Sequence, residues 1–243
     1  MRSFFGELIG TFILVLFGCG VVGWSLFIQP LDLIQISIVW GLTVILAIFC
    51  SAPYSRAHLN PAVSIAFLID KAIPKKELLP HLFGQFVGGL MAAYVLYLLF
   101  KEYLDLDSVN SAMMFGEYFP NPGNKSLTVL GHLNAFGAEF TGTFLLMFGI
   151  LLIIKYKGVG AKLLNPILIG VLLTLLIYFF APYTQAGFNP FRDFAPRLLS
   201  YLMGWDKAFS YNGWGWLTVY MIAPILGAIS AALLDKILFK NNK

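Results

Sequence analysis

The chain has 243 residues, of which 59% are hydrophobic and 12% charged, with a net charge of +4. Soluble domains usually carry about a quarter charged residues, so this composition argues against a soluble enzyme and against a disordered chain. Two cysteines are too few for the framework of a small disulfide-stabilised domain.

Six long stretches are free or nearly free of charged residues, and each exceeds the roughly 20 residues that cross a bilayer as a helix. They cover residues 8–31, 33–55, 78–100, 126–154, 163–191 and 208–234, with Glu139 inside the fourth. The first stretch contains no signal-peptide cleavage pattern and follows Glu7, so we expect it to be retained as the first span.

Two further segments do not fit a span: the first is apolar but too short to cross, and the second holds Arg192, Asp193 and Arg197 among apolar residues. Residues 57–69 open with His58-Leu59-Asn60-Pro61, and residues 189–203 open with Asn189-Pro190. Segments of this length are typical of re-entrant elements, which enter the membrane and leave on the same side.

An internal repeat relates the two halves of the chain. Residues 7–12 (ELIGTF) resemble residues 139–144 (EFTGTF), and residues 57–61 (AHLNP) resemble residues 186–190 (AGFNP) at nearly the same offset. Three spans in each half force the second copy to enter from the opposite face, so the repeats must be inverted.

The predicted fold is therefore an all-α membrane protein with six transmembrane helices and two re-entrant half-helices in inverted repeats. We expect one channel domain over residues 1–243. Residues 1–101 form the first repeat, residues 102–130 an extracellular connecting loop, and residues 131–243 the second repeat.

The distribution of Lys and Arg predicts that both termini are cytoplasmic, because cytoplasmic loops are enriched in these residues. With that orientation, the outer side holds only Lys101, Lys125, Arg192, Arg197 and Lys207. The larger inner set is Arg2, Arg56, Lys71, Lys75, Lys76, Lys155, Lys157, Lys162, Lys236, Lys240 and Lys243.

Each short segment begins with a helix-start signal. Asn is a strong N-cap and Pro is favoured at the first helical position, so Asn60-Pro61 and Asn189-Pro190 predict two helices that begin near the bilayer centre. Asn-Pro in a lone position is more often a simple loop turn, as at Asn121-Pro122. The matching repeat positions favour helix starts, whose partial positive charges would face a shared pore and repel cations.

Charged residues inside the predicted spans are functional candidates, because burying a charge in lipid is costly. Arg192 lies one turn after Asn189 and is predicted to share its face toward the pore. Asp193 would hold a neighbouring loop, balance Arg192 or face the outer water. Glu7 and Glu139, at equivalent repeat positions, are expected to accept hydrogen bonds from re-entrant backbone N–H groups, in preference to relaying protons.

On these residues the chain resembles the major intrinsic proteins, the aquaporins and aquaglyceroporins. The resemblance rests on two boxes, Asn60-Pro61-Ala62 and Asn189-Pro190-Phe191, with Glu7 and Glu139. It implies a homotetramer with one pore in each subunit, and loop-supporting roles for Glu7, Glu139, His58 and Asp193. Asp directly after the Arg is typical of glycerol facilitators.

The resemblance also implies a narrow selectivity filter formed by Trp40, Ile177, Ala186 and Arg192. Water-selective members usually have Phe at the first of these positions and His at the second, whereas this ring is apolar with one polar corner. A similar ring is found in the nodulin-type plant proteins, which pass glycerol and other small neutral solutes.

Two positions depart from the family pattern. Phe191 replaces the usual Ala of the second box, so its ring must tilt away, repack the centre or narrow the pore. Ala186 replaces the Phe that is usual in glycerol facilitators, which predicts a wider filter.

We therefore expect a passive channel for glycerol and other small neutral solutes in the lipid bilayer, with water as a co-permeant and with ions and protons excluded. The competing hypotheses are a water-dominant channel, a channel for urea, ammonia or undissociated small acids, and a proton-coupled transporter. No enzymatic, metal, cofactor or nucleic-acid-binding pattern is present. A plasma membrane, of the bacterial inner type, is the expected location.

Overall fold

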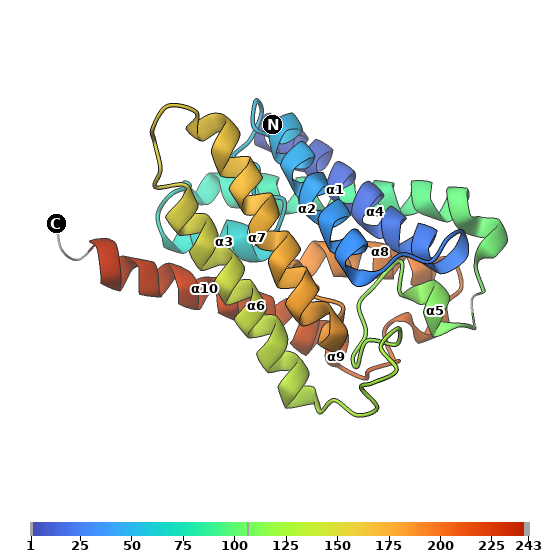
Figure 1. Ribbon diagram of the computed structural model, residues 1–243. Coiled ribbons are helices and arrows are strands. Elements are labelled where there is room, and N and C mark those ends of the chain that lie inside the picture. The colour runs from blue at the N-terminus through green and yellow to red at the C-terminus, as the bar shows by residue number, and fades with distance from the viewer. Residues whose placement is uncertain (1, 106, 241–243) are drawn as a thin grey trace.

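The computed structural model describes residues 2–105 and 107–240, and every regular element within them is helical. Met1, Leu106 and residues 241–243, among them Lys243 of the predicted inner set, lie outside the described residues. Figure 1 shows a bundle in which the long helices cross one another at an angle.

The predicted spans are confirmed, since six helices among the described residues are long and apolar enough to cross a membrane. The first five are α1 (Arg2–Phe27), α2 (Leu33–Ser51), α4 (Lys75–Phe100), α6 (His132–Ile153) and α7 (Ala161–Thr184). The sixth is a continuous run of α9 (Gly215–Leu217), the π-helical turn η3 (Thr218–Ile222), α10 (Ala223–Asp235) and the π-helical turn η4 (Lys236–Lys240).

The helix ends differ from the charge-free stretches for local reasons. Helix α1 already begins at Arg2, because a long charged side chain at a helix end reaches water while its backbone stays helical. Helix α7 stops at Thr184, seven residues before the apolar stretch ends, because Gln185 adopts a left-handed conformation with φ of 63°. That stop leaves a non-helical loop before Asn189.

The two short segments form the predicted half-helices, α3 (Pro61–Ile69) and α8 (Pro190–Leu202). In each, Asn is the N-cap, its side chain accepts a backbone N–H of the first turn, and Pro is the first helical residue. The half-helices run from the middle of the molecule toward opposite ends (Figure 1).

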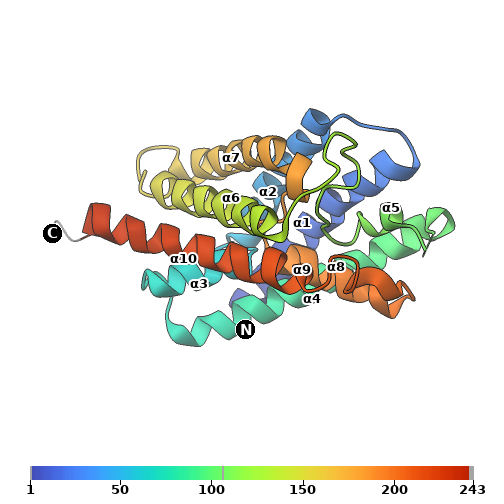
Figure 2. The ribbon, with the colours of Figure 1, turned by 90° about the horizontal axis from the view of Figure 1, so that it is seen from below.

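The packing follows the repeat. Helix α1 packs on α2 and α4, as α6 packs on α7 and α10, while α3 contacts α10 and α8 contacts α4. Figure 2 shows α6 between α7 on one side and α10 on the other. The remaining described elements, η1 (Lys101–Tyr103), α5 (Val109–Ala112) and η2 (Asp206–Ala208), lie in the connections.

Glycines allow the closest crossings. A Cβ on Gly88 of α4 would lie 2.3 Å from the Leu8 carbonyl oxygen of α1, and one on Gly227 of α10 would lie 2.3 Å from the Phe140 carbonyl oxygen of α6. Because Leu8 and Phe140 are equivalent in the repeat, the same backbone-to-backbone contact is made twice.

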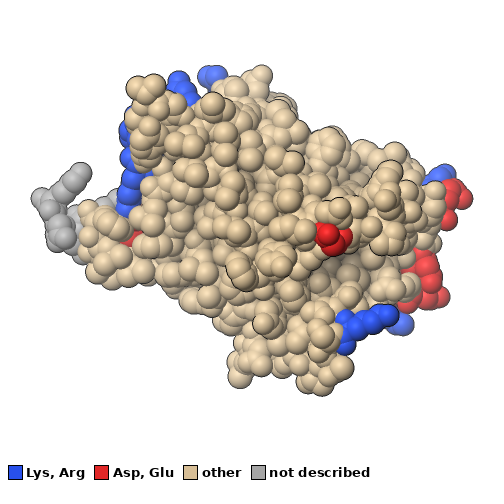
Figure 3. Space-filling model, viewed as in Figure 1, with Lys and Arg blue, Asp and Glu red and all other residues tan. Residues whose placement is uncertain are grey.

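The surface is that of an integral membrane protein. In the face shown in Figure 3, most Lys, Arg, Asp and Glu side chains gather near the two ends, and a broad uncharged surface lies between them. Large apolar side chains such as Leu42, Phe83, Leu99 and Phe179 are exposed on the long helices, where acyl chains would contact them.

Candidate functional site

The two half-helices meet through their capping asparagines. The Asn60 Nδ2 donates to the Phe188 carbonyl oxygen at 2.8 Å, and the Asn189 Nδ2 donates to the Leu59 carbonyl oxygen at 2.7 Å. Each side chain also caps its own helix, since Asn60 Oδ1 accepts the Ala62 N–H at 2.8 Å. Each asparagine is thus fixed by both halves of the chain, and one amide hydrogen of each Nδ2 is left for a further acceptor.

Two buried glutamates hold the loops that precede the asparagines. Glu7 accepts the N–H groups of His58 at 2.9 Å and Leu59 at 2.7 Å, one on each carboxylate oxygen. Glu139 accepts the N–H groups of Gly187 at 2.9 Å and Phe188 at 2.8 Å in the same way. This is the contact predicted from the sequence for Glu7 and Glu139.

The held loops have an unusual backbone. Four residues have a positive φ, between 52° and 60°, which residues other than glycine rarely adopt: Ala57, Leu59, Ala186 and Phe188. The glutamate contacts stabilise this conformation, and the side chains fit because glycines face two of them. A Cβ on Gly10 would lie 2.3 Å from Leu59, and one on Gly142, its repeat equivalent, 2.0 Å from Phe188.

His58 adds a side-chain contact to the first loop. Its Nδ1 lies 3.1 Å from the Ser64 hydroxyl of α3, and its ring stacks on Phe67 with 4.7 Å between centroids. The ring is buried and also borders the central cavity. His58 therefore ties the loop to the half-helix that it precedes.

A cavity of about 220 Å³ runs between the half-helices. It reaches from Arg56 and Asn165 to Trp40 and Arg192, and both capping asparagines line it. One wall is formed by apolar side chains of α1, α2, α6 and α7, and the other by the two re-entrant loops. The cavity is thus lined both by apolar side chains of the long helices and by residues of the two re-entrant loops, with both capping asparagines.

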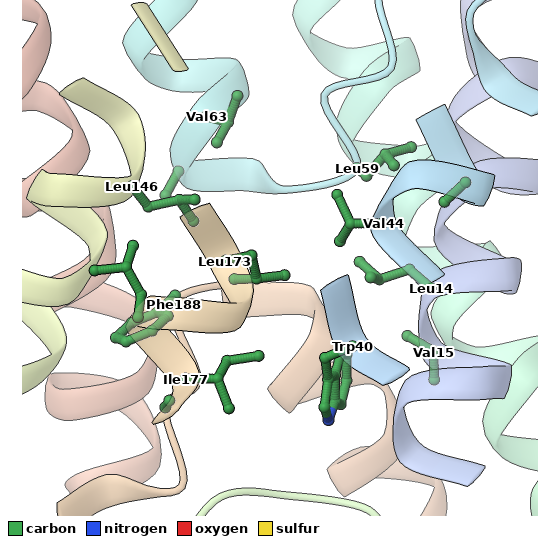
Figure 4. Close-up of a cluster of buried hydrophobic side chains, with 14 of the residues drawn as sticks. Leu14, Val15, Trp40, Val44, Leu59, Val63, Leu146, Leu173, Ile177 and Phe188 are labelled. Carbon is green, nitrogen blue, oxygen red and sulfur yellow. The ribbon is translucent and has the colours of Figure 1, made fainter. Parts of the chain in front are cut away.

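Trp40, Ile177, Ala186 and Arg192 all line one part of this cavity. The Arg192 guanidinium carbon lies 4.5 Å from the centroid of the Trp40 ring, a cation–π distance. In the view of Figure 4, Ile177 lies across from Trp40 at a similar level. The structure therefore brings together the four residues that the family resemblance singles out.

Phe191 points away from the cavity. Its ring packs edge-on against Phe86 of α4, with 5.6 Å between centroids, and it is not among the residues that line the cavity. Of the three arrangements that the sequence allows for this ring, the structure has the one in which it tilts away. It begins a chain of half-buried aromatic rings that continues through Phe86 to Phe194.

Glu117, in the connection between α5 and α6, is a residue that sequence reasoning missed. Its carboxylate forms an ion pair with the Arg192 guanidinium, and both side chains are buried. Burial raises the pKa of the Glu117 carboxyl to about 8, against the opposing effect of Arg192. A buried Arg needs an anionic partner, but the predicted connecting loop, residues 102–130, also holds Glu102, Asp105 and Asp107, and no sequence signal selects Glu117 among them.

Arg197 and Asp193 position Glu117. Asp193 accepts the Glu117 N–H at 2.7 Å, and Arg197 donates to the Glu117 carbonyl oxygen at 2.5 Å and to both Asp193 carboxylate oxygens. Arg197 also donates to the Ala208 carbonyl oxygen at 2.5 Å. Asp193 therefore holds a neighbouring loop, and it neither pairs with Arg192 nor faces water.

Six membrane-crossing helices around a central cavity, with two half-helices meeting inside it, define a membrane channel. The sequence model of the family described as "Major intrinsic protein" matches residues 1–235. The chain therefore belongs to the major intrinsic protein family, whose members are channels and facilitators and not enzymes.

Similar proteins carry more specific names. The chain is 35% identical to the glycerol uptake facilitator protein of Haemophilus influenzae, covering 95% of this chain and 91% of that protein. It is 32% identical to the propanediol uptake facilitator PduF of Salmonella typhimurium, covering 97% and 93%. The X-ray structure of the aquaglyceroporin from Plasmodium falciparum shares the fold, with a TM-score of 0.85, 24% identity and coverage of 99% and 97%.

Proposed function

We propose that this protein is a passive channel for glycerol and other small neutral solutes, with water as a co-permeant and with ions and protons excluded. The observation that carries the proposal is the ring of Trp40, Ile177, Ala186 and Arg192 on the cavity that both capping asparagines line. The names of the glycerol and propanediol facilitators that the chain resembles support the same class of solute.

The proposed passage matches the two-sided cavity to the two-sided solute. A polyol presents carbon-bound hydrogens along one side and hydroxyls along the other. The carbon side slides along Trp40 and Ile177, while the hydroxyls exchange hydrogen bonds with Arg192, the loop carbonyls and the two asparagine amides. Each step replaces one set of hydrogen bonds with another, so no tightly bound state is needed.

Charge exclusion is proposed to come from three fixed positive groups. The N-termini of α3 and α8 carry partial positive charge and meet at Asn60 and Asn189. Arg192 adds a guanidinium at the ring. Cations entering this cavity would lose water of hydration and meet these positive groups.

Stopped-flow light scattering on proteoliposomes tests the proposal. A glycerol gradient should cause shrinkage followed by re-swelling at a rate that depends on the protein. Shrinkage alone would support a water-dominant channel, and re-swelling only with urea, ammonia or a small acid would support a channel for those solutes. Solute accumulation driven by a pH gradient would instead indicate a proton-coupled transporter.

The double variant Trp40→Phe/Ile177→His is expected to lower the ratio of glycerol permeability to water permeability by about tenfold or more. The double change removes apolar surface from the ring and adds a polar imidazole that favours water. The ratio of glycerol to water permeability in the same vesicles checks this prediction. Leu173→His, one helical turn away on the same cavity wall, is the matched control, and an unchanged ratio in the Trp40/Ile177 variant would refute the filter assignment.

Phe191→Ala is expected to leave the ratio of glycerol to water permeability unchanged, because the ring lies outside the cavity. Losing a half-buried ring contact should destabilise the protein by about 1–3 kcal/mol. Thermal unfolding in detergent measures this loss. If the loss comes from the Phe86 contact, Phe86→Ala and Phe191→Ala should be less than additive, whereas full additivity would count against that contact.

We also propose the membrane setting: a homotetramer in a bacterial inner membrane, with both termini cytoplasmic. The family resemblance supports the tetramer, and the Lys and Arg distribution supports the orientation. Within each subunit, residues 1–243 form one channel domain, with repeats 1–101 and 131–243 joined by residues 102–130.

A further inference from the structure

Behind the Trp40 ring lies a glycine. A Cβ built on Gly18 of α1 would lie 2.2 Å from Trp40 Cζ3, 2.3 Å from Cη2 and 2.5 Å from Cε3. Non-bonded carbon atoms pack at about 3.5–4.0 Å. The six-membered part of the indole therefore occupies the space that any side chain at position 18 would need.

The Trp40 indole has little freedom to move elsewhere. Trp40 is 5% exposed, and the Arg192 guanidinium lies over it at 4.5 Å. In Figure 4, Val15 of α1 lies on one side of the indole and Ile177 on the other. The indole is rigid, so a group added at position 18 would rotate it about its side-chain torsions away from α1. The space available in that direction is the cavity.

This contact differs from the other glycine contacts of α1. Gly6, Gly10 and Gly23 face Ser55, Leu59 and Met114, none of which belongs to the ring. For Gly20, two residues after Gly18, a Cβ would meet only Leu96 Cδ2, at an ordinary 3.4 Å. Among the described glycines of α1, Gly18 is the one that contacts a residue of the proposed selectivity filter.

We propose that Gly18 is a positioning residue that determines specificity: its missing side chain forms the seat that holds the Trp40 indole back from the cavity and so sets the width of the filter. This inference rests on the proposed function, in which Trp40 is part of the filter. It predicts that the size limit for solutes is set in part by a residue that no solute touches.

The test compares Gly18→Ala, Gly20→Ala, Trp40→Phe and the double variant Gly18→Ala/Trp40→Phe in proteoliposomes. We expect Gly18→Ala to lower glycerol permeability per channel by about tenfold, with a smaller loss of water permeability, because one methyl group in a tight apolar site is worth 10-fold or more. Gly20→Ala gains the same helix propensity without meeting the indole, so its permeabilities should stay unchanged. Phe has no second ring to meet the new methyl group, so the double variant should match Trp40→Phe alone.

The outcomes separate the inference from the proposed function. If Trp40→Phe changes the ratio of glycerol to water permeability and Gly18→Ala does not, the filter assignment is supported and the proposed role of Gly18 is refuted. If Trp40→Phe leaves the ratio unchanged, the filter assignment itself fails. If Gly18→Ala does not fold but the double variant does, the indole is the group that clashes and the seat is supported. If neither folds, Gly18 serves packing independently of Trp40 and the inference is overturned.

Discussion

Glu139→Gln is expected to unfold the second re-entrant loop and to abolish solute flux. The Glu139 carboxylate is fully buried and accepts the N–H groups of Gly187 and Phe188 and the Thr184 hydroxyl, the last at 2.6 Å. A Gln side chain keeps one oxygen and turns an NH₂ group toward a backbone N–H. Hydrogen bonds to a charged acceptor contribute about 1.5–3 kcal/mol each. We therefore expect the free energy of unfolding to fall by about 3 kcal/mol or more.

Thermal unfolding of the purified protein in detergent measures the loss, and glycerol flux in proteoliposomes measures its functional result. Glu7→Gln should behave alike, since Glu7 makes the equivalent contacts to His58 and Leu59. Glu102→Gln is the control, because its side chain is 81% exposed in a connection. A Glu139→Gln protein with unaltered melting temperature and flux would contradict the supporting role of the carboxylate.

Arg192→Ala is expected to admit cations and polyols longer than glycerol, with an increase in their permeability of about tenfold or more. The change removes a positive charge and most of a large side chain from the ring, and the Trp40 face loses the group stacked on it. It also leaves the buried Glu117 carboxylate without its cation. Fluxes of Na⁺ and of a series of polyols of increasing length into proteoliposomes measure the two effects.

The double variant Arg192→Ala/Glu117→Gln separates charge from size. Measured at a pH above the raised pKa of Glu117, where the single variant carries a carboxylate in the opened ring, cation flux in the double variant should fall below that of the single variant, while the longer polyols should still pass. Arg192→Lys keeps the charge but not the planar guanidinium, so it should retain cation exclusion. If Arg192→Ala retains both the cation barrier and the size limit of the unmodified protein, Arg192 does not control the narrow part of the cavity.

Much of the architecture follows from local sequence signals. The membrane spans are long apolar runs. The half-helices are predicted by Asn60-Pro61 and Asn189-Pro190, because the capping hydrogen bonds form within one helical turn. The repeat of the Glu7 region at Glu139 indicates which loops the two glutamates hold. The parity of three spans in each half then fixes the inverted arrangement.

The parts that sequence reasoning missed or left open depend on contacts between distant segments. Glu117 meets Arg192 because an irregular loop folds back over the half-helix, and no periodic pattern marks that path. The direction of Phe191 depends on the space beside Phe86 on another helix. The contact of Gly18 with Trp40 depends on how closely α1 and α2 approach, which a glycine permits but does not specify.

The reciprocal bonds between the asparagines and the opposite loops have a consequence for biogenesis. Asn60 and Phe188 are separated by 128 positions along the chain, and Leu59 and Asn189 by 130. A ribosome that has delivered the first three spans has therefore produced a half-helix whose amide and carbonyl partners are not yet synthesised. The first half therefore lacks these hydrogen bonds until the second half has been synthesised. The two halves expressed as separate polypeptides should reach the folded structure only when they are made together.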